Sequence, residues 1–142
     1  MDAGADATLT DADCNNSLHA AAKNNHTGIV RELLTRSLVP IDSLGGENWS
    51  ALHYASSEGH AEVAAILAES KADLNAVTSN GESSLMLATR LNHWSVVKVL
   101  VRSKANLDVV ANDGETALRI SLKKDYKNIY EFLLENGANT DL

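Results

Sequence analysis

The sequence predicts an all-α solenoid of stacked helix-turn-helix units, joined by linkers that form β-turns or hairpins. The first observation is a repeat in which one leucine recurs at steps of 34, 33 and 33 residues, at Leu18, Leu52, Leu85 and Leu118. The second is that apolar residues within each copy follow the helical spacing of three and four, and the third is that turn-forming residues separate the copies. A fixed period in this range is typical of stacked-repeat proteins, and four periods account for nearly all of the 142 residues.

The second copy shows the expected elements in chain order. Its turn, "GGEN", precedes Ser50, which is expected to cap a first helix that ends at Gly59. The buried face of that helix is formed by Leu52, Ala55 and Ser56. A second helix is expected over residues 61–70, and the turn-rich linker "KADLNAVTSNG" leads into the next copy. Helices this short are marginal alone, so neighbouring copies are expected to stack and bury their apolar faces together. Small residues are expected to let the first helices approach closely, at Ala21, Ala55, Ala88 and Ser121.

The histidines raise the question of a metal or catalytic site, because histidine supplies both ligands and general bases. All of them occupy two repeat positions, which are filled by His19 and His53 and by His26, His60 and His93. A metal or catalytic site has no reason to be copied at the period of the fold, so we interpret the histidines as structural. Cys14 lies in a turn, and "SLGGEN" lacks the Gly-Lys-Ser/Thr that completes a phosphate-binding loop. We therefore expect no catalytic residue, no metal site and no cofactor.

The order of motifs in each copy resembles the ankyrin repeat. It consists of a turn, a Ser or Thr, Leu-His-x-Ala, Gly-His, an aliphatic helix and Gly-Ala-Asp, and the resemblance covers the whole chain. It implies a single domain with four repeats over about 11–44, 45–77, 78–110 and 111–142, whereas 1–10 resembles the tail of a preceding repeat.

The copies depart from the family pattern at several positions. Lys71 and Lys104 replace the helix-ending glycine, at a cost of roughly 1–2 kcal/mol for a left-handed lysine. Cys14 and Asn48 replace the turn glycine, which is kept as Gly81 and Gly114. The first copy carries one extra residue near "TRSLVPI", and none has the usual proline after the capping residue. We expect modest stability and an intact fold.

Composition excludes several classes of function. The net charge of −7 disfavours nucleic acid as a partner, because binding phosphates requires clustered lysine and arginine. No apolar run approaches the roughly 20 residues that cross a bilayer, and the N-terminus lacks the features of a secretion signal. A single cysteine is in keeping with a reducing compartment. We expect a monomeric intracellular domain, cytoplasmic or nuclear, that does not insert into a membrane.

The resemblance implies a protein-binding module without catalytic activity, with a concave groove lined by the turn tips and the exposed face of each first helix. The tips carry five acids and no base, which suggests a basic protein or peptide as partner. These acids are Asp13, Glu47, Glu82, Asp113 and Glu115. Apolar residues at the groove positions complete the candidate partner-binding set, namely Trp49, Tyr54, Leu87 and Leu91. Trp94 opens a second helix on the outer side and is expected to pack locally.

Two alternatives remain for the setting of this module. The chain opens in what resembles the tail of one repeat and stops where another would begin, which favours a regulatory ankyrin segment of a longer enzyme or channel. The other alternative is a free-standing inhibitor, similar to the small four-repeat ankyrin proteins that block kinases.

Overall fold

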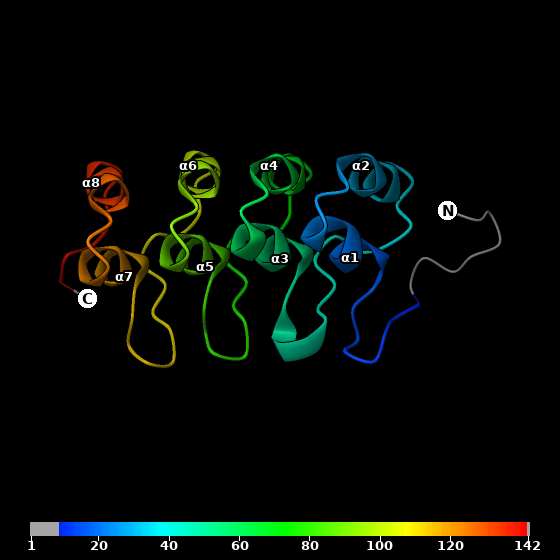
Figure 1. Cartoon of the computed structure of the whole chain (residues 1–142), viewed down its shortest axis with the longest axis horizontal. Coiled ribbons are helices and arrows are strands. Elements are labelled where there is room, and N and C mark those ends of the chain that lie inside the picture. Colours follow the sequence, from blue (N-terminus) through cyan, green and yellow to red (C-terminus); the bar gives the residue numbers. More distant parts are fainter. Residues whose placement is uncertain (1–8, 142) are drawn as a thin grey trace.

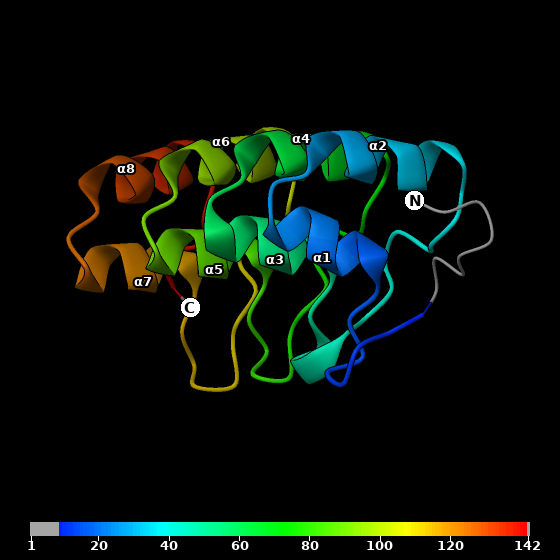
Figure 2. The ribbon, with the colours of Figure 1, turned by 45° about the vertical axis from the view of Figure 1, so that its right-hand side comes forward.

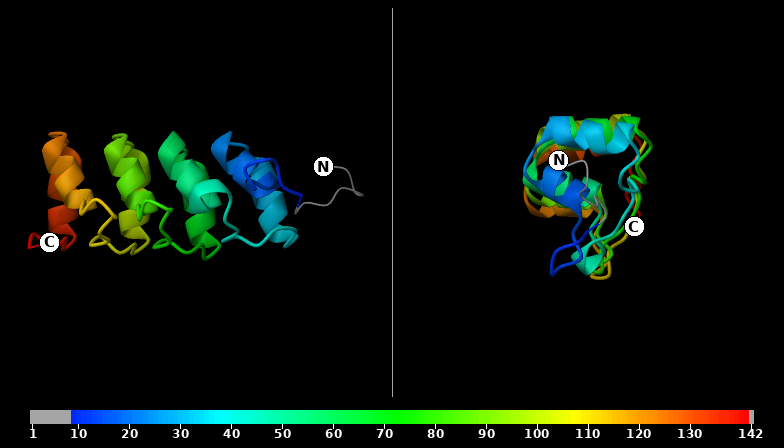
Figure 3. Two further views of the ribbon diagram at one scale, coloured as in Figure 1. Left: turned by 90° about the horizontal axis from the view of Figure 1, so that it is seen from below. Right: turned by 90° about the vertical axis from the view of Figure 1, so that its right-hand side faces the viewer.

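The computed structural model describes residues 9–141, over which eight α-helices form four consecutive pairs (Figure 1). The first helices of the pairs are α1 (Ser17–Lys23), α3 (Ala51–Glu58), α5 (Ser84–Arg90) and α7 (Ala117–Lys123). The second helices are α2 (Thr27–Thr35), α4 (Ala61–Glu69), α6 (Trp94–Arg102) and α8 (Lys127–Glu135). The two sets form two layers, and a hairpin projects from the first layer ahead of each pair (Figures 2 and 3). The predicted all-α solenoid is confirmed.

The boundaries of the first helices follow from local hydrogen bonding. Each begins after a residue whose side-chain oxygen accepts a hydrogen bond from the backbone N–H three residues later, and these residues are Asn16, Ser50, Ser83 and Thr116. Such a cap satisfies one of the free N–H groups of the first turn. At the other end of α3, Gly59 is left-handed with φ of 78°. Ser50 and Gly59 therefore have the predicted roles, and the second helix ends at Glu69, with Ser70 as its cap.

The core is a continuous apolar seam between the two layers. The repeated leucines Leu18, Leu52, Leu85 and Leu118 are 0%, 1%, 1% and 7% exposed, as their period predicts. The small residues between adjacent first helices are also buried, at Ala21, Ala55, Ala88 and Ser121. Because each pair buries its apolar face against its neighbours, stability depends on the stack as a whole.

The linkers between pairs are joined by a ladder of side-chain to backbone bonds, which the repeat analysis did not anticipate. Asp42 Oδ1 accepts from the backbone N–H of Asp73 at 2.8 Å, one linker further along the stack. The next two steps run from Asn106 N–H to Asn75 Oδ1 at 2.7 Å and from Asn139 N–H to Asp108 Oδ1 at 2.8 Å. Each linker is thereby fixed to its neighbour.

The departures from the family pattern lie where left-handed backbone is required. Lys71 and Lys104 both have φ of 71°, and Gly137 fills the equivalent position in the fourth pair. At the hairpin tips, Cys14 and Asn48 have φ of 64° and 60°. The sequence expectation that these residues replace glycine in left-handed conformation is confirmed.

Two expectations concern the limits of the chain and its relation to membranes. Residues 1–8, which hold most of the segment that resembles a preceding repeat, lie outside the described residues. Across residues 9–141, no helix is long and apolar enough to cross a membrane.

Candidate functional site

The histidines of the first helices are built into the fold. His53 is buried, its Nδ1 accepts from the backbone N–H of Ser50 at 2.9 Å, and its Nε2 lies 2.9 Å from the carbonyl oxygen of Ala76. His19 makes the equivalent contacts with Asn16 and Ser43. Burial lowers the pKa of both imidazoles below the usual 6.5, which favours the neutral ring.

The histidines before the second helices join neighbouring pairs. His60 Nε2 lies 2.9 Å from the carbonyl oxygen of Lys23, and His93 Nε2 lies 2.8 Å from that of Ser57. Among residues 9–141, no three His, Cys, Asp or Glu side chains are grouped so that they could hold a metal ion. The structural interpretation of the histidines agrees with these contacts.

The surface that remains for recognition is formed by the hairpin tips and the solvent side of α1, α3, α5 and α7, which we call the inner face (Figure 2). Each tip is closed by a backbone bond, with N–H to O distances of 2.8–3.0 Å across Asp11–Asn15, Gly45–Trp49, Thr78–Glu82 and Ala111–Glu115. Adjacent tips are also joined, because Ser79 N–H donates to Glu47 O at 2.9 Å and Asn112 N–H donates to Asn80 O at 3.0 Å. The second, third and fourth tips thus form one connected edge.

Ion pairs occupy the inner face in the third and fourth repeats. The carboxylate of Glu82 lies 3.3 Å from Arg90 Nη2, and that of Glu115 lies 2.7 Å from Lys123 Nζ. Both glutamate side chains are only about one-sixth exposed, at 16% and 15%. The expected row of five acids without a base is therefore only partly present. The tip residues were counted correctly, but the compensating bases lie eight residues later, at the ends of α5 and α7.

In the second repeat, an aromatic residue stands where the third and fourth have a carboxylate. Trp49 is the equivalent of Glu82 and Glu115, and Ser57 is the equivalent of their basic partners. The half-buried Trp49 ring packs on Tyr54 with 5.1 Å between ring centroids. The sequence analysis proposed Trp49 as a partner-binding residue, and the structure shows that its ring also has a local contact, with Tyr54 at the fourth position of α3.

Tyr54 links this aromatic pair to the first repeat. Its hydroxyl donates to Asn15 Oδ1 at 2.8 Å, and Lys23 Nζ lies 5.9 Å from its ring centroid. Burial raises the pKa of the Tyr54 phenol, and the negative charges of Asp11 and Asp13 raise it further. An ammonium group and the negative charges of two carboxylates therefore both act on this side chain.

The other candidate residues differ in how much surface they offer. Leu91 is 49% exposed at the end of α5, whereas Leu87 is only 7% exposed. Leu87 was predicted to contact a partner, but little of its side chain is exposed for such a contact. The acids Asp13, Glu47 and Asp113 are exposed. Trp94 packs edge-on against Phe132 with 5.1 Å between centroids, as the expectation of local packing requires.

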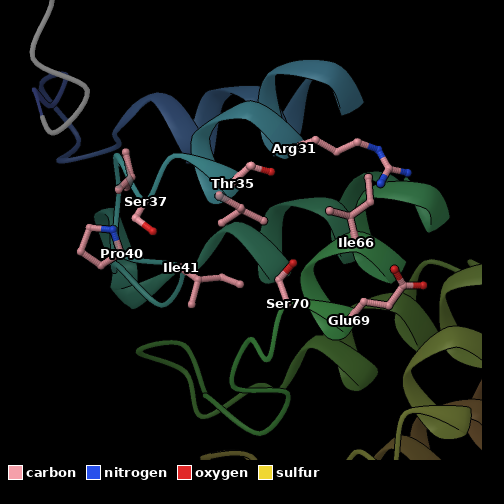
Figure 4. Close-up of a pocket in the computed structure, with 10 residues that line it drawn as sticks. Arg31, Thr35, Ser37, Pro40, Ile41, Ile66, Glu69 and Ser70 are labelled. Atoms are coloured by element: carbon pink, nitrogen blue, oxygen red, sulfur yellow. The ribbon is translucent and has the colours of Figure 1, made fainter.

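A hollow lies on the outer side, between α2 and α4 (Figure 4). It encloses about 540 Å³ and arises beside the extra residue of the first repeat. Leu38 takes the place of the alanine found in later linkers, because its N–H donates to Leu33 O as that of Ala72 does to Leu67 O. Val39 follows it and is buried, and the displaced linker borders an open hollow of mixed polarity. No convergent set of polar groups identifies a ligand there.

Comparisons with known proteins agree with this geometry. The family model for ankyrin repeats, which holds three copies, matches residues 1–78 and 70–142. A comparison with curated proteins gives no match. Since the matches together span the chain and the described helices form the pairs that the repeat requires, this chain belongs to the ankyrin-repeat family.

Proposed function

We propose that this chain is a non-catalytic module that binds a partner protein or peptide through its inner face. Ankyrin repeats are in general protein–protein interaction modules. The observation that carries the proposal here is the aromatic pair Trp49–Tyr54, which stands on the inner face at a position where later repeats have an ion pair. Aromatic residues of this kind are enriched among the residues that dominate binding energy.

The charge of the inner face suggests a basic partner. The exposed acids Asp13 and Glu47 have no ion pair with a base within the described structure, whereas Glu82 and Glu115 are already compensated. Uncompensated charge of one sign attracts an oppositely charged surface and increases the rate of association. With Asp11, three exposed acids without an ion pair in the described part of the chain thus lie at the first two tips, and Asp113 is a fourth at the last tip.

Site-specific cross-linking tests this function. A photoreactive phenylalanine analogue is placed at Leu91, which is exposed on the inner face, and separately at Arg102, which is exposed on the outer helix α6. We expect one defined protein to cross-link from position 91 and not from position 102, and the purified partner to bind the Trp49→Ala variant less tightly than wild type. Equal cross-linking from both positions, or an unchanged affinity of the folded Trp49→Ala variant, would count against the inner face as the binding surface.

The setting of the module follows from the same experiment. A cross-link within one longer polypeptide supports a regulatory segment of an enzyme or channel, and a cross-link to a separate kinase-like enzyme supports a free-standing inhibitor.

A further inference from the structure

The inner face is asymmetric along the stack, and this asymmetry identifies what its first half recognises; the inference rests on the function proposed above. In repeats three and four, Glu82 and Glu115 are bonded to bases of their own repeat. In repeat two, Trp49 fills the carboxylate position and no base follows it. In the described structure the first two repeats therefore lack the ion pair of repeats three and four, and in repeat two the aromatic surface of Trp49 and Tyr54 lies at this position.

A cation already lies over this aromatic surface. Lys23 Nζ is 5.9 Å from the Tyr54 ring centroid, within the distance at which an ammonium group is attracted to an aromatic ring. Lys23 is the repeat equivalent of Arg90 and Lys123, but it is exposed and lies within 4.0 Å of no carboxylate in the described structure. In the first repeat, where Asn15 stands in place of the carboxylate, the equivalent base therefore lies near the Tyr54 ring.

The surroundings of the ring favour positive charge. Asp11 is held in place because its Oδ1 accepts from the backbone N–H groups of Asp13 at 2.8 Å and Asn15 at 2.9 Å. Asn15 in turn accepts from the Tyr54 hydroxyl, so the first tip is attached to the ring. The exposed carboxylates of Asp11 and Asp13 act on the phenol electrostatically and raise its pKa, after the larger effect of burial. An approaching cation would meet both the ring and this negative field.

We propose that the Tyr54–Trp49 pair is a subsite for an arginine side chain of the partner, and that Lys23 occupies this subsite in the free protein. A guanidinium is planar, more weakly hydrated than an ammonium and able to stack on an aromatic face, so it competes well against an exposed lysine. The second tryptophan does not offer such a site. Lys98 lies 5.3 Å from the Trp94 ring on the same helix, and Phe132 packs against that ring.

The test is a titration of the labelled 142-residue chain, followed by NMR, with the blocked peptide Ac-Gly-Arg-Gly-Arg-Gly-NH2. The probe is compared with the same peptide carrying neutral citrulline in place of arginine. The indole N–H signals of Trp49 and Trp94 are observed separately, after assignment with Trp49→Phe. We expect the Trp49 signal to shift to saturation with the arginine peptide only, while the Trp94 signal remains in place. An unmoved Trp49 signal, or equal shifts with both peptides, would overturn the proposal.

Two lysine variants separate local competition from overall charge. Lys23→Gln removes the internal cation, and Lys124→Gln removes another exposed lysine, at the end of α7. Lys23→Gln should bind the arginine peptide about two- to fivefold more tightly than wild type, from the usual strength of an exposed cation–aromatic contact. Lys124→Gln should produce less than half of that change, and equal tightening in both variants would refute a role for Lys23.

Failure of this inference is distinguishable from failure of the proposed function. If the peptide does not shift the Trp49 signal but a partner still cross-links from position 91, the inner face binds through other residues. Only the arginine subsite is then refuted. If the peptide binds at Trp49 but no protein cross-links selectively from position 91, the arginine subsite is supported and the proposed function of the inner face is refuted.

Discussion

The imidazole Nε2 of His53 lies 2.9 Å from the carbonyl oxygen of Ala76, so that one ring connects helix α3 to the linker that follows α4. The other ring nitrogen accepts from Ser50 N–H, which leaves Nε2 as the donor and requires the neutral tautomer. Protonation would place a second hydrogen on Nδ1, opposite the Ser50 N–H. His19 has the same arrangement with Asn16 and Ser43.

Folding stability is therefore expected to fall on acidification. Burial depresses the folded-state pKa of His19 and His53 below the usual 6.5, so between those values the unfolded chain binds more protons than the folded one. The contribution is complete above about pH 6.5 and is lost as pH falls from there through the folded pKa. Urea unfolding at pH 7.5, 6.5 and 5.5 should show a decreasing midpoint. The decrease should be smaller in the double variant His19→Gln, His53→Gln, and it should be as large as in wild type in His26→Gln, since His26 is exposed. Equal decreases of the midpoint in wild type and both variants would contradict this prediction.

Leu52 should contribute strongly to stability, because its side chain is 1% exposed between the two layers. Leu52→Ala is expected to lower the free energy of unfolding by roughly 2–5 kcal/mol, the usual cost of losing a buried leucine side chain. Leu91→Ala is the matched control, since Leu91 is 49% exposed and its truncation should change stability by less than about 0.5 kcal/mol. Chemical denaturation measures both. Similar losses in the two variants would show that Leu52 is not specially buried.

The repeat period explains how much of this structure could be predicted. Leu52, Ser50 and Gly59 were placed correctly because burial, capping and helix termination are local patterns copied in each unit. The ion pairs of the inner face were not anticipated, because Glu82 and Arg90 come from different elements, eight residues apart, and only the fold brings their side chains together. The linker ladder was missed for a related reason, since its side-chain and backbone partners are 31 residues apart.

Gly45 should be required for contact between the first two hairpin tips. A Cβ added there would collide with the side-chain oxygen of Asn15, which also accepts from Tyr54. Gly45→Ala is therefore expected to lower stability by about 1–3 kcal/mol, as overpacking usually does. Gly28 in α2 has no atom within 4 Å of such a Cβ, so Gly28→Ala should raise stability by about 0.5–1 kcal/mol. Thermal unfolding of the two alanine variants should shift in opposite directions, and a stabilised Gly45→Ala would disprove the close contact.

Lys71 and Lys104 should each cost the protein stability, because both hold φ of 71° at a position where the fourth repeat has Gly137. A left-handed conformation brings Cβ too close to the following carbonyl oxygen, and glycine has no Cβ. Each lysine-to-glycine change is expected to raise the free energy of unfolding by about 0.5–1 kcal/mol, less than the full strain because glycine loses more backbone freedom on folding. Lys124 caps α7 with φ of −90°, so Lys124→Gly has no strain to relieve and should not stabilise the protein. Urea denaturation of the double variant Lys71→Gly, Lys104→Gly, compared with Lys124→Gly, measures the difference. If all three lysines respond alike, the gain comes from lost charge or side-chain entropy and not from backbone conformation.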